Sequence, residues 1–274
     1  MNSSNLLKQI ATLCYETQHF DALNENISGL MKKRGQSKKA QIDLVQLAMS
    51  WLPHIADEKE RNRLIFTLRD VTDKKIFLEV EYARLVLLIV KGKEDDNDIN
   101  EAAKILQEVQ VETYGSMDRR EKLEFILYQM KIMIRKKDYI RLFVISKKIN
   151  ENNLNDDAIA DLKITYYAYL AIYYNHFDKF YEASQCYKTI WETLVTTKQA
   201  LPEVLDFNFN AEKINSLSNY VGFLVLHPYS DKSTKQLQAL KANREIEKIP
   251  HIKNLVAAFL NKEVVSSDTS SYNL

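Results

Sequence analysis

The sequence predicts an all-α protein built as a solenoid of antiparallel helix pairs, with about 13 helices. Three observations lead to this fold class. The 274 residues include only five Gly and four Pro, where average usage would give roughly 19 and 14, so the turn residues of strand-rich folds are missing. Apolar residues recur at spacings of three and four along almost the whole chain. A weak repeat of about 40 residues favours a solenoid over a closed bundle.

The apolar stripes place the helices in chain order. Four segments come first, over residues 6–17, 20–31, 37–52 and 57–71. The best-defined helices are predicted over 75–91, 99–113, 119–136, 139–151, 156–175 and 179–197, followed by 214–226, 230–245 and 250–262. Connections of about two to eight residues make consecutive helices antiparallel neighbours. We therefore expect one helical-repeat domain over residues 1–262, best defined over 75–197, and a disordered polar tail over 263–274.

The internal repeat aligns residues 101–109, 141–149 and 182–190, at spacings of 40 and 41 residues. Three sets of positions correspond, namely Ala102, Leu142 and Ala183, then Ile105, Ile145 and Cys186, and then Val109, Ile149 and Ile190. Their offsets of three, four and seven place them on one face of a helix. Each repeat follows a longer apolar helix, so a helix pair of about 40 residues is the unit that stacks.

The charge balance excludes some classes of partner. Lys and Arg total 38 and Asp and Glu total 37, so the strong basic field of a nucleic-acid-binding protein is absent. Two basic clusters, 32–34 and 135–137, are predicted to lie in last helical turns, where cations complement the helix dipole. The acidic run 94–98 is predicted to be a solvated loop that caps the next helix. It lacks the glycine and final glutamate of a calcium-binding loop.

Compartment and membrane association follow from equally simple features. No apolar run approaches the ~18 residues that cross a bilayer, so we expect no membrane span. Cys14 and Cys186 do not form a disulfide scaffold. The N-terminus has no signal-peptide pattern. These features predict a soluble intracellular protein.

No motif for chemistry is found. The five histidines lack metal-site spacing, and G-x-S-x-G, GxGxxG and GxxxxGK[ST] are absent. We expect no catalytic, cofactor-binding or metal-binding residues, no cofactor and no small-molecule substrate, and hence no enzyme. The unusual local feature is a cluster of aromatic residues at 166, 167, 169, 173, 174 and 177. Core packing is the favoured interpretation, and an interface is the alternative, for which Tyr169 is the better candidate because it lies off both apolar stripes.

Three segments carry a family resemblance: TDKKIFLEVEYAR at 72–84, AAKILQEVQVETYGSM at 102–117 and FLVLHPYS at 223–230. In this order and spacing they resemble the family of the fifth non-ATPase subunit of the proteasome regulatory-particle lid. The resemblance implies a right-handed, TPR-like superhelix of the PCI type, a scaffold without catalytic residues that supports lid assembly and ubiquitin-dependent protein degradation. It implies as partners the other lid subunits, including the deubiquitinase, the ATPase ring and the core particle. It also implies a location in the cytoplasm and the nucleus.

The family pattern adds three expectations. Members continue into a winged-helix PCI module and a long C-terminal helix, so a chain that stops at Leu274 is expected to lack that module, which leaves its incorporation into a lid open. Gly115 is expected to adopt a left-handed conformation after a helix that ends near Thr113, with Ser116 or Asp118 capping the next helix. The alternatives are a scaffold of a related PCI complex (the COP9 signalosome or the translation-initiation scaffold), an unrelated helical-repeat adaptor, or a helical-repeat enzyme or small-ligand protein.

Overall fold

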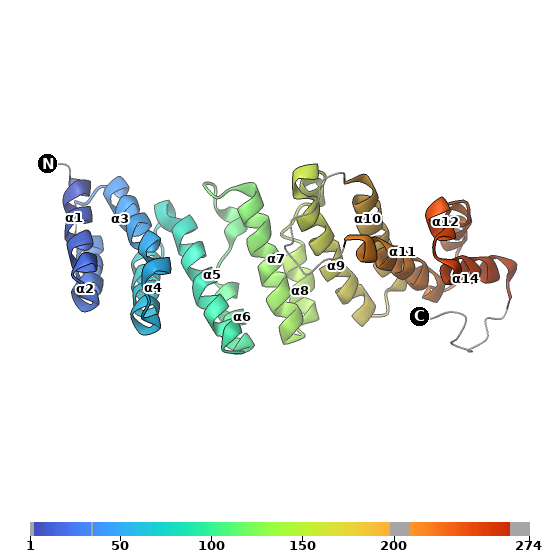
Figure 1. The fold of residues 1–274 in the computed structure, drawn as a ribbon, viewed down its shortest axis with the longest axis horizontal. Coiled ribbons are helices and arrows are strands. Elements are labelled where there is room, and N and C mark those ends of the chain that lie inside the picture. Colours follow the sequence, from blue (N-terminus) through green and yellow to red (C-terminus); the bar gives the residue numbers. More distant parts are fainter. Residues whose placement is uncertain (1–2, 34, 198–208, 264–274) are drawn as a thin grey trace. The chain divides into compact units, whose positions relative to one another are not determined.

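A computed structural model describes residues 3–33, 35–197 and 209–263, and these contain fourteen α-helices, five short 3-10 helices and no strand (Figure 1). The all-α prediction is confirmed. One helix more than expected is present because the segment predicted as 230–245 forms two helices, α12 (Asp231–Lys241) and α13 (Arg244–Glu247). Asn243 separates them, since its side chain accepts a hydrogen bond from the Glu245 amide at 2.9 Å and caps α13. The tail predicted to be disordered lies outside the described residues from 264 onward.

The chain divides into two compact units, Met1–Lys122 and Leu123–Leu274. The first unit contains α1 (Ser3–Glu16), α2 (Phe20–Lys32), α3 (Lys38–Trp51), α4 (Glu58–Thr72), α5 (Glu79–Asp95) and α6 (Ile99–Gln107). Helix α1 packs on α2 and α3, α2 packs on α4, α4 packs on α5, and α5 packs on α6. The first unit is therefore a row of three helical hairpins, α1/α2, α3/α4 and α5/α6 (Figure 1).

The second unit holds the remaining helices. Helix α7 (Arg119–Lys136) begins four residues before the boundary, and α8 (Tyr139–Ser146), α9 (Ala160–His176), α10 (Phe180–Thr196), α11 (Phe209–Leu226) and α14 (Pro250–Asn261) follow. Helix α8 packs on α9, α9 on α10 and α10 on α11. Helices α11, α12 and α14 pack on one another, and α13 packs on α14. The right-handed sense of the repeat stack and the single repeat domain over 1–262 stay predictions.

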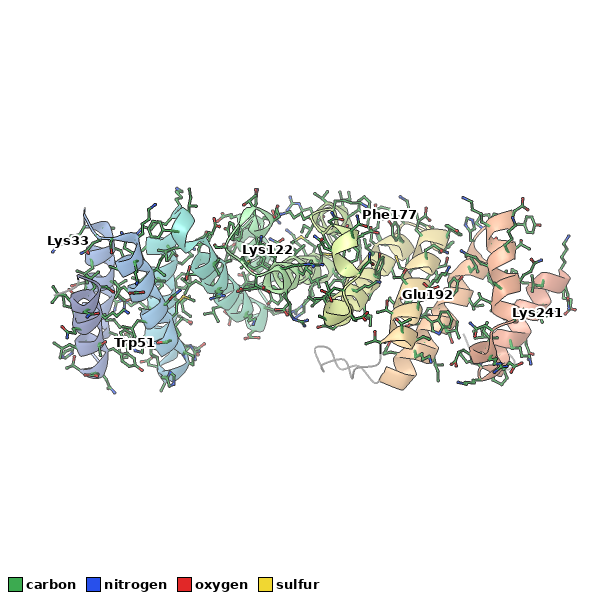
Figure 2. All side chains as sticks on the ribbon, turned by 90° about the horizontal axis from the view of Figure 1, so that it is seen from above. Lys33, Trp51, Lys122, Phe177, Glu192 and Lys241 are labelled. Carbon is green, nitrogen blue, oxygen red and sulfur yellow. The ribbon has the colours of Figure 1, made fainter. Side chains whose placement is uncertain are left out.

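Each unit has its own apolar core. In the first unit, Leu23, Ile27, Leu44, Leu64 and Leu68 are fully buried and come from α2, α3 and α4. Trp51 lies between the first two hairpins (Figure 2). Its ring stacks on Tyr15 of α1 with centroids 4.5 Å apart. The second unit has a core where α11, α12, α13 and α14 meet. The spacing of three and four that predicted the helices is thus the spacing of their buried faces.

A recurring turn joins the two helices of a hairpin. Gln18, Asn97, Lys137 and Asp178 have left-handed φ values between 53° and 61°. The amide of the next residue donates to the carbonyl five residues earlier in all four turns, at 2.8–3.0 Å. This is the Schellman ending of a helix. The turns at Asn97, Lys137 and Asp178 are 40 and 41 residues apart, which confirms the repeat length read from the sequence.

The predicted repeat positions are buried with one exception. Ala102, Leu142, Ala183 and Val109 are 0% exposed, and Ile145, Ile149, Cys186 and Ile190 are 4–8% exposed. Ile105 is partly buried against the first-unit core. The alignment of the three repeats is therefore confirmed.

Two helices are shorter than predicted at their C-terminal ends. The helices predicted to reach 113 and 151 stop at Gln107 and Ser146, and short 3-10 helices follow at Val111–Thr113 and Glu151–Leu154. Val109 and Ile149 lie beyond the observed helix ends. Because both are buried, they continue the apolar pattern past the helices. Periodicity reports burial, and here the burial continues beyond the helix.

The left-handed conformation predicted at Gly115 was also wrong, because Gly35 is the glycine with positive φ among the described residues. With α6 ending at Gln107, Gly115 follows a short 3-10 helix and not an α-helix. Of the two predicted caps, Asp118 fills the role, since its side chain accepts from the Arg120 amide at 2.9 Å.

The charged clusters lie close to their predicted positions. Lys32 lies in the last turn of α2, and Arg135 and Lys136 lie in the last turn of α7. Arg34 lies outside the described residues. Asp98 caps α6 by accepting from the Glu101 amide at 3.2 Å, as predicted for the acidic run. The first two residues of that run belong to α5 and not to a loop.

Candidate protein-interaction surface

The aromatic cluster predicted from the sequence is only partly core, since two of its six residues are buried, three are half-buried and one is exposed. Tyr166 and Tyr173, on α9, are 1% and 9% exposed, as the core interpretation predicted. Phe177 follows the last residue of the same helix and is labelled in Figure 2; its side chain is 42% exposed. Tyr169, the residue singled out for an interface, is half-buried. Its role in an interface stays a prediction.

An aromatic ladder joins α8 to α9 and was not predicted. Its members are Tyr139, Phe143, Tyr173, His176 and Phe177. Tyr139 stacks on His176 at 3.9 Å between ring centroids, and Phe143 stacks on Tyr173 at 4.5 Å. The sequence carried a usable signal, because Tyr139 and Phe143 are four residues apart, as are Tyr173 and Phe177.

Two lysines complete the aromatic ladder. The Nζ atom of Lys147 lies 4.6 Å from the centroid of Phe143, and that of Lys179 lies 5.9 Å from the centroid of Tyr173. Both distances are within the range of cation–π attraction. The stacked rings of the aromatic ladder therefore hold α8 against α9. The two lysines place positive charge next to these rings.

The side of α8 that lies opposite the buried Leu142 is exposed and apolar at its centre. Ile140 and Val144, four residues apart, are 70% and 61% exposed, while Leu142 and Ile145 of the same helix are buried. Lys137, Arg141 and Lys147 are exposed beside them. We call these five residues, Lys137, Ile140, Arg141, Val144 and Lys147, the α8 outer face. Helix α8 thus packs with one side and leaves an apolar pair with a basic border on the other.

Hollows also lie elsewhere on the surface of both units. One of about 320 Å³ lies between α4 and α5, where Phe66 and Leu88 are 43% and 40% exposed. Another of about 330 Å³ lies among α11, α12 and α14, with the exposed Tyr229 and Phe259 in its wall. Each is large enough for an apolar side chain of a partner, which is a property of contact surfaces.

Several phenols and one thiol in the second unit are held neutral by burial. Burial raises the pKa of the Cys186 thiol to about 12, and it raises the pKa of Tyr167 to about 12 with the help of the nearby Glu151 carboxylate. A thiol held neutral is a poor nucleophile and a poor metal ligand. These groups therefore favour packing over chemistry.

The histidines lie in separate surroundings. His54 Nδ1 lies 3.2 Å from the Ser50 carbonyl oxygen, His176 belongs to the aromatic ladder, and His227 lies against the ring of Tyr181. In the part of the chain that the structure describes, no group of three or more His, Cys, Asp or Glu side chains could hold a metal ion. None of the helices described there is long and apolar enough to cross a membrane.

Comparison with known proteins gives consistent matches. A family model described as "PSMD12/CSN4, N-terminal" matches residues 1–199. The 26S proteasome non-ATPase regulatory subunit 12 of Dictyostelium discoideum is 35% identical over 98% of this chain and 58% of its own length. The 26S proteasome regulatory subunit RPN5 of Saccharomyces cerevisiae is 34% identical over 96% of this chain and 58% of its own length. Homolog B of subunit 12 from Arabidopsis thaliana is 34% identical over 94% and 61%. The chain thus spans about three fifths of the length of these curated relatives.

Proposed function

Because the chain belongs to the PSMD12/CSN4 N-terminal family, we propose that it is a non-catalytic scaffold subunit of the proteasome regulatory-particle lid. In this role it supports lid assembly and ubiquitin-dependent protein degradation through protein–protein contacts. The observation that carries the proposal is the similarity to proteins named as proteasome regulatory subunits, which extends over 94–98% of this chain.

The physical features of the chain support a scaffold. Hairpins packed in series give an extended surface per residue, and specificity comes from the side chains that this surface exposes. Buried phenols and a buried neutral thiol in the second unit suit a packing role. We therefore propose that the protein is not an enzyme and uses no cofactor.

The partners and the location follow from the same proposal. The partners are other lid subunits including the deubiquitinase, together with the ATPase ring and the core particle. The protein works in the cytoplasm and the nucleus. Nucleic acid, membranes and small-molecule substrates are not among its partners.

Quantitative affinity purification of the tagged full chain from its source cells tests the proposal. We expect the lid subunits, the deubiquitinase among them, to be recovered in near-equal amounts. Recovery of COP9 signalosome or translation-initiation subunits would assign the chain to a related scaffold. Recovery of neither from a chain that is folded would contradict the proposal.

A matched pair of variants makes the purification specific for the folded hairpins. Ala102→Asp places a charge in a fully buried position of α6, and Asn100→Asp places the same charge on an exposed position of the same helix. We expect the first variant to lose the lid subunits and the second to retain them. Equal recovery with both variants would mean that the contact does not need the folded hairpin.

A further inference from the structure

Hydrogen bonds at the start of each second helix identify the residues of other hairpins that are equivalent to Ile140 and Val144 of α8. In five hairpins, the carbonyl of the residue that precedes the second helix accepts a hydrogen bond from the amide four residues later. The pairs, amide first, are Leu23 and His19, Arg61 and Asp57, Ala102 and Asp98, Leu142 and Asp138, and Ala183 and Lys179. These bonds fix the second helices in a common register. Ile140 and Val144 are the second and sixth residues after Asp138, the residue that precedes α8.

The same two positions are polar in the three preceding hairpins. They are Asp21 and Glu25 in α2, Lys59 and Arg63 in α4, and Asn100 and Lys104 in α6, all of them exposed. In α10 they are Tyr181 and Gln185, which are partly buried, and Gln185 exchanges hydrogen bonds with Gln236 of α12. Stacking of the hairpins therefore does not require aliphatic side chains there. Ile140 and Val144 are the exception, and their own exposure of 70% and 61% shows that no described residue covers them.

The chain segment that carries this apolar pair is strongly basic. Residues 131–148 contain seven Lys or Arg and one Asp, in a chain whose formal net charge is +1. The one Asp is Asp138, and it forms an ion pair with Arg141 at 3.4 Å. Lys137 stands at the turn before α8, and Lys147 stands at its end with Nζ over the ring of Phe143. The pair thus lies between positive charges at both ends of the helix.

We propose that the α8 outer face binds an acidic segment of a partner protein that carries two apolar side chains at helical spacing. The apolar side chains contact Ile140 and Val144, and carboxylates on either side contact Lys137, Arg141 and Lys147. This inference rests on the proposed scaffold function, because it gives the chemistry of one of its contacts.

A protein segment fits this face better than a nucleic acid does. Proteins bind single-stranded nucleic acid by stacking bases on exposed aromatic rings, whereas the centre of this face is two aliphatic side chains. The aromatic rings of α8 are turned to α9, where Phe143 stacks on the buried Tyr173. The aliphatic centre with a charged border is the arrangement of protein interfaces.

Photo-cross-linking tests the inference on the full chain in its source cells. A benzoylphenylalanine replaces Val144, and the matched control carries it at Lys104, the equivalent position of α6. After irradiation and purification, the cross-linked peptide is sequenced by mass spectrometry. We expect Val144, and not Lys104, to give a cross-link to a peptide rich in Asp and Glu with apolar residues three or four apart.

Charge reversal gives the second arm of this test. Lys137→Glu with Lys147→Glu is expected to lower the cross-link yield at Val144 about tenfold. Lys232→Glu with Lys235→Glu, the same charge change at exposed positions of α12, is expected to leave it unchanged.

Three results would overturn the inference: a cross-link from Val144 no stronger than from Lys104, a cross-linked peptide that is neutral or basic, or a cross-link to RNA. The proposed function is judged separately by the lid subunits in the same purification. If they are recovered while Val144 gives no cross-link, the scaffold function stands and this inference fails.

Discussion

Cys186 lies at a repeat position that Ile105 and Ile145 fill in the two preceding hairpins, and it is 4% exposed. Burial raises the pKa of its thiol from 9.0 to about 12, which lowers the thiolate fraction at pH 8 about a thousandfold. Cys14 is less deeply buried. We therefore predict that 5,5′-dithiobis(2-nitrobenzoic acid) labels one thiol quickly in the folded chain at pH 8, and both after denaturation.

The variants Cys14→Ser and Cys186→Ser assign the labelled thiol. The chain that keeps Cys186 alone should react slowly until it is unfolded. Rapid labelling of that chain under native conditions would show that the position is not packed as described.

At the scale of the element, the hairpin turns use side-chain-bearing residues where glycine is the usual choice. Lys137 has a φ of 61°, a conformation that costs an L-residue roughly 1–2 kcal/mol and costs glycine little. Lys137→Gly is expected to raise the free energy of unfolding by about 0.5–1 kcal/mol, after the extra chain entropy of glycine is subtracted. Lys91→Gly, in the interior of α5, is the matched control and should lower it by about 1 kcal/mol. Urea unfolding followed by circular dichroism measures both, and a loss of stability in both variants would argue against the left-handed turn.

The buried face of the second helix in a hairpin is tested by a charge. Ala102 is fully buried where α6 packs on α5, so Ala102→Asp is expected to cost about 3–5 kcal/mol, the cost of an unpaired buried charge. Asn100→Asp, on the exposed side of α6, should change stability by less than about 0.5 kcal/mol. Thermal unfolding of the two variants is the measurement. Equal melting temperatures would mean that the wrong face of α6 has been assigned to the core.

The sequence predicts the helices and their buried faces well because both follow from apolar spacing. Helix α7 occupies the predicted range 119–136, and the repeat positions are buried. Helix ends were less predictable, since Val109 and Ile149 continue the pattern from turns. The left-handed turns escaped prediction because Gln18 and Lys137 are not residue types that favour positive φ.

Surface features were harder to predict than the core. The α8 outer face depends on which side of a helix is covered, and a whole-chain net charge near zero hides a local excess of basic residues. The sequence alone names Ile140 and Val144 as apolar, and the contacts made by α8 show that they lie opposite the packed side.

At the scale of the whole molecule, buried phenols and a buried thiol make the stability of the fold depend on pH in the alkaline range. Burial raises the pKa of six groups in the second unit: Tyr166, Tyr167, Tyr174, Cys186, Tyr187 and Tyr220. The folded chain then holds more protons than the unfolded chain above pH 9, so stability falls as the pH rises. The stability that these groups contribute is fully present below their pKa values in the unfolded chain, which are 9.0 for the thiol and 10.0 for the phenols. It is lost as the pH rises through about 12. In the first unit, burial also raises the pKa of Tyr82 and Tyr114, which act in the same direction. Lys75, whose pKa burial lowers, acts in the opposite direction as one group against eight.

The expected loss is about 1 kcal/mol by pH 11 for each fully buried phenol. Urea unfolding at pH 8, 9, 10 and 11 measures it, and absorbance at 295 nm reports ionised tyrosine. The buried tyrosines should ionise only as the chain unfolds, so their part of the absorbance change should coincide with unfolding. A stability that stays constant from pH 8 to 11 would contradict the burial of these groups.

Native mass spectrometry of the tagged full chain, purified from its source cells, tests most directly the proposal that the chain is a structural member of the proteasome lid. The account predicts one copy of the chain in an assembly whose other masses are those of lid subunits. A folded chain that is found alone, or only with further copies of itself, would contradict it.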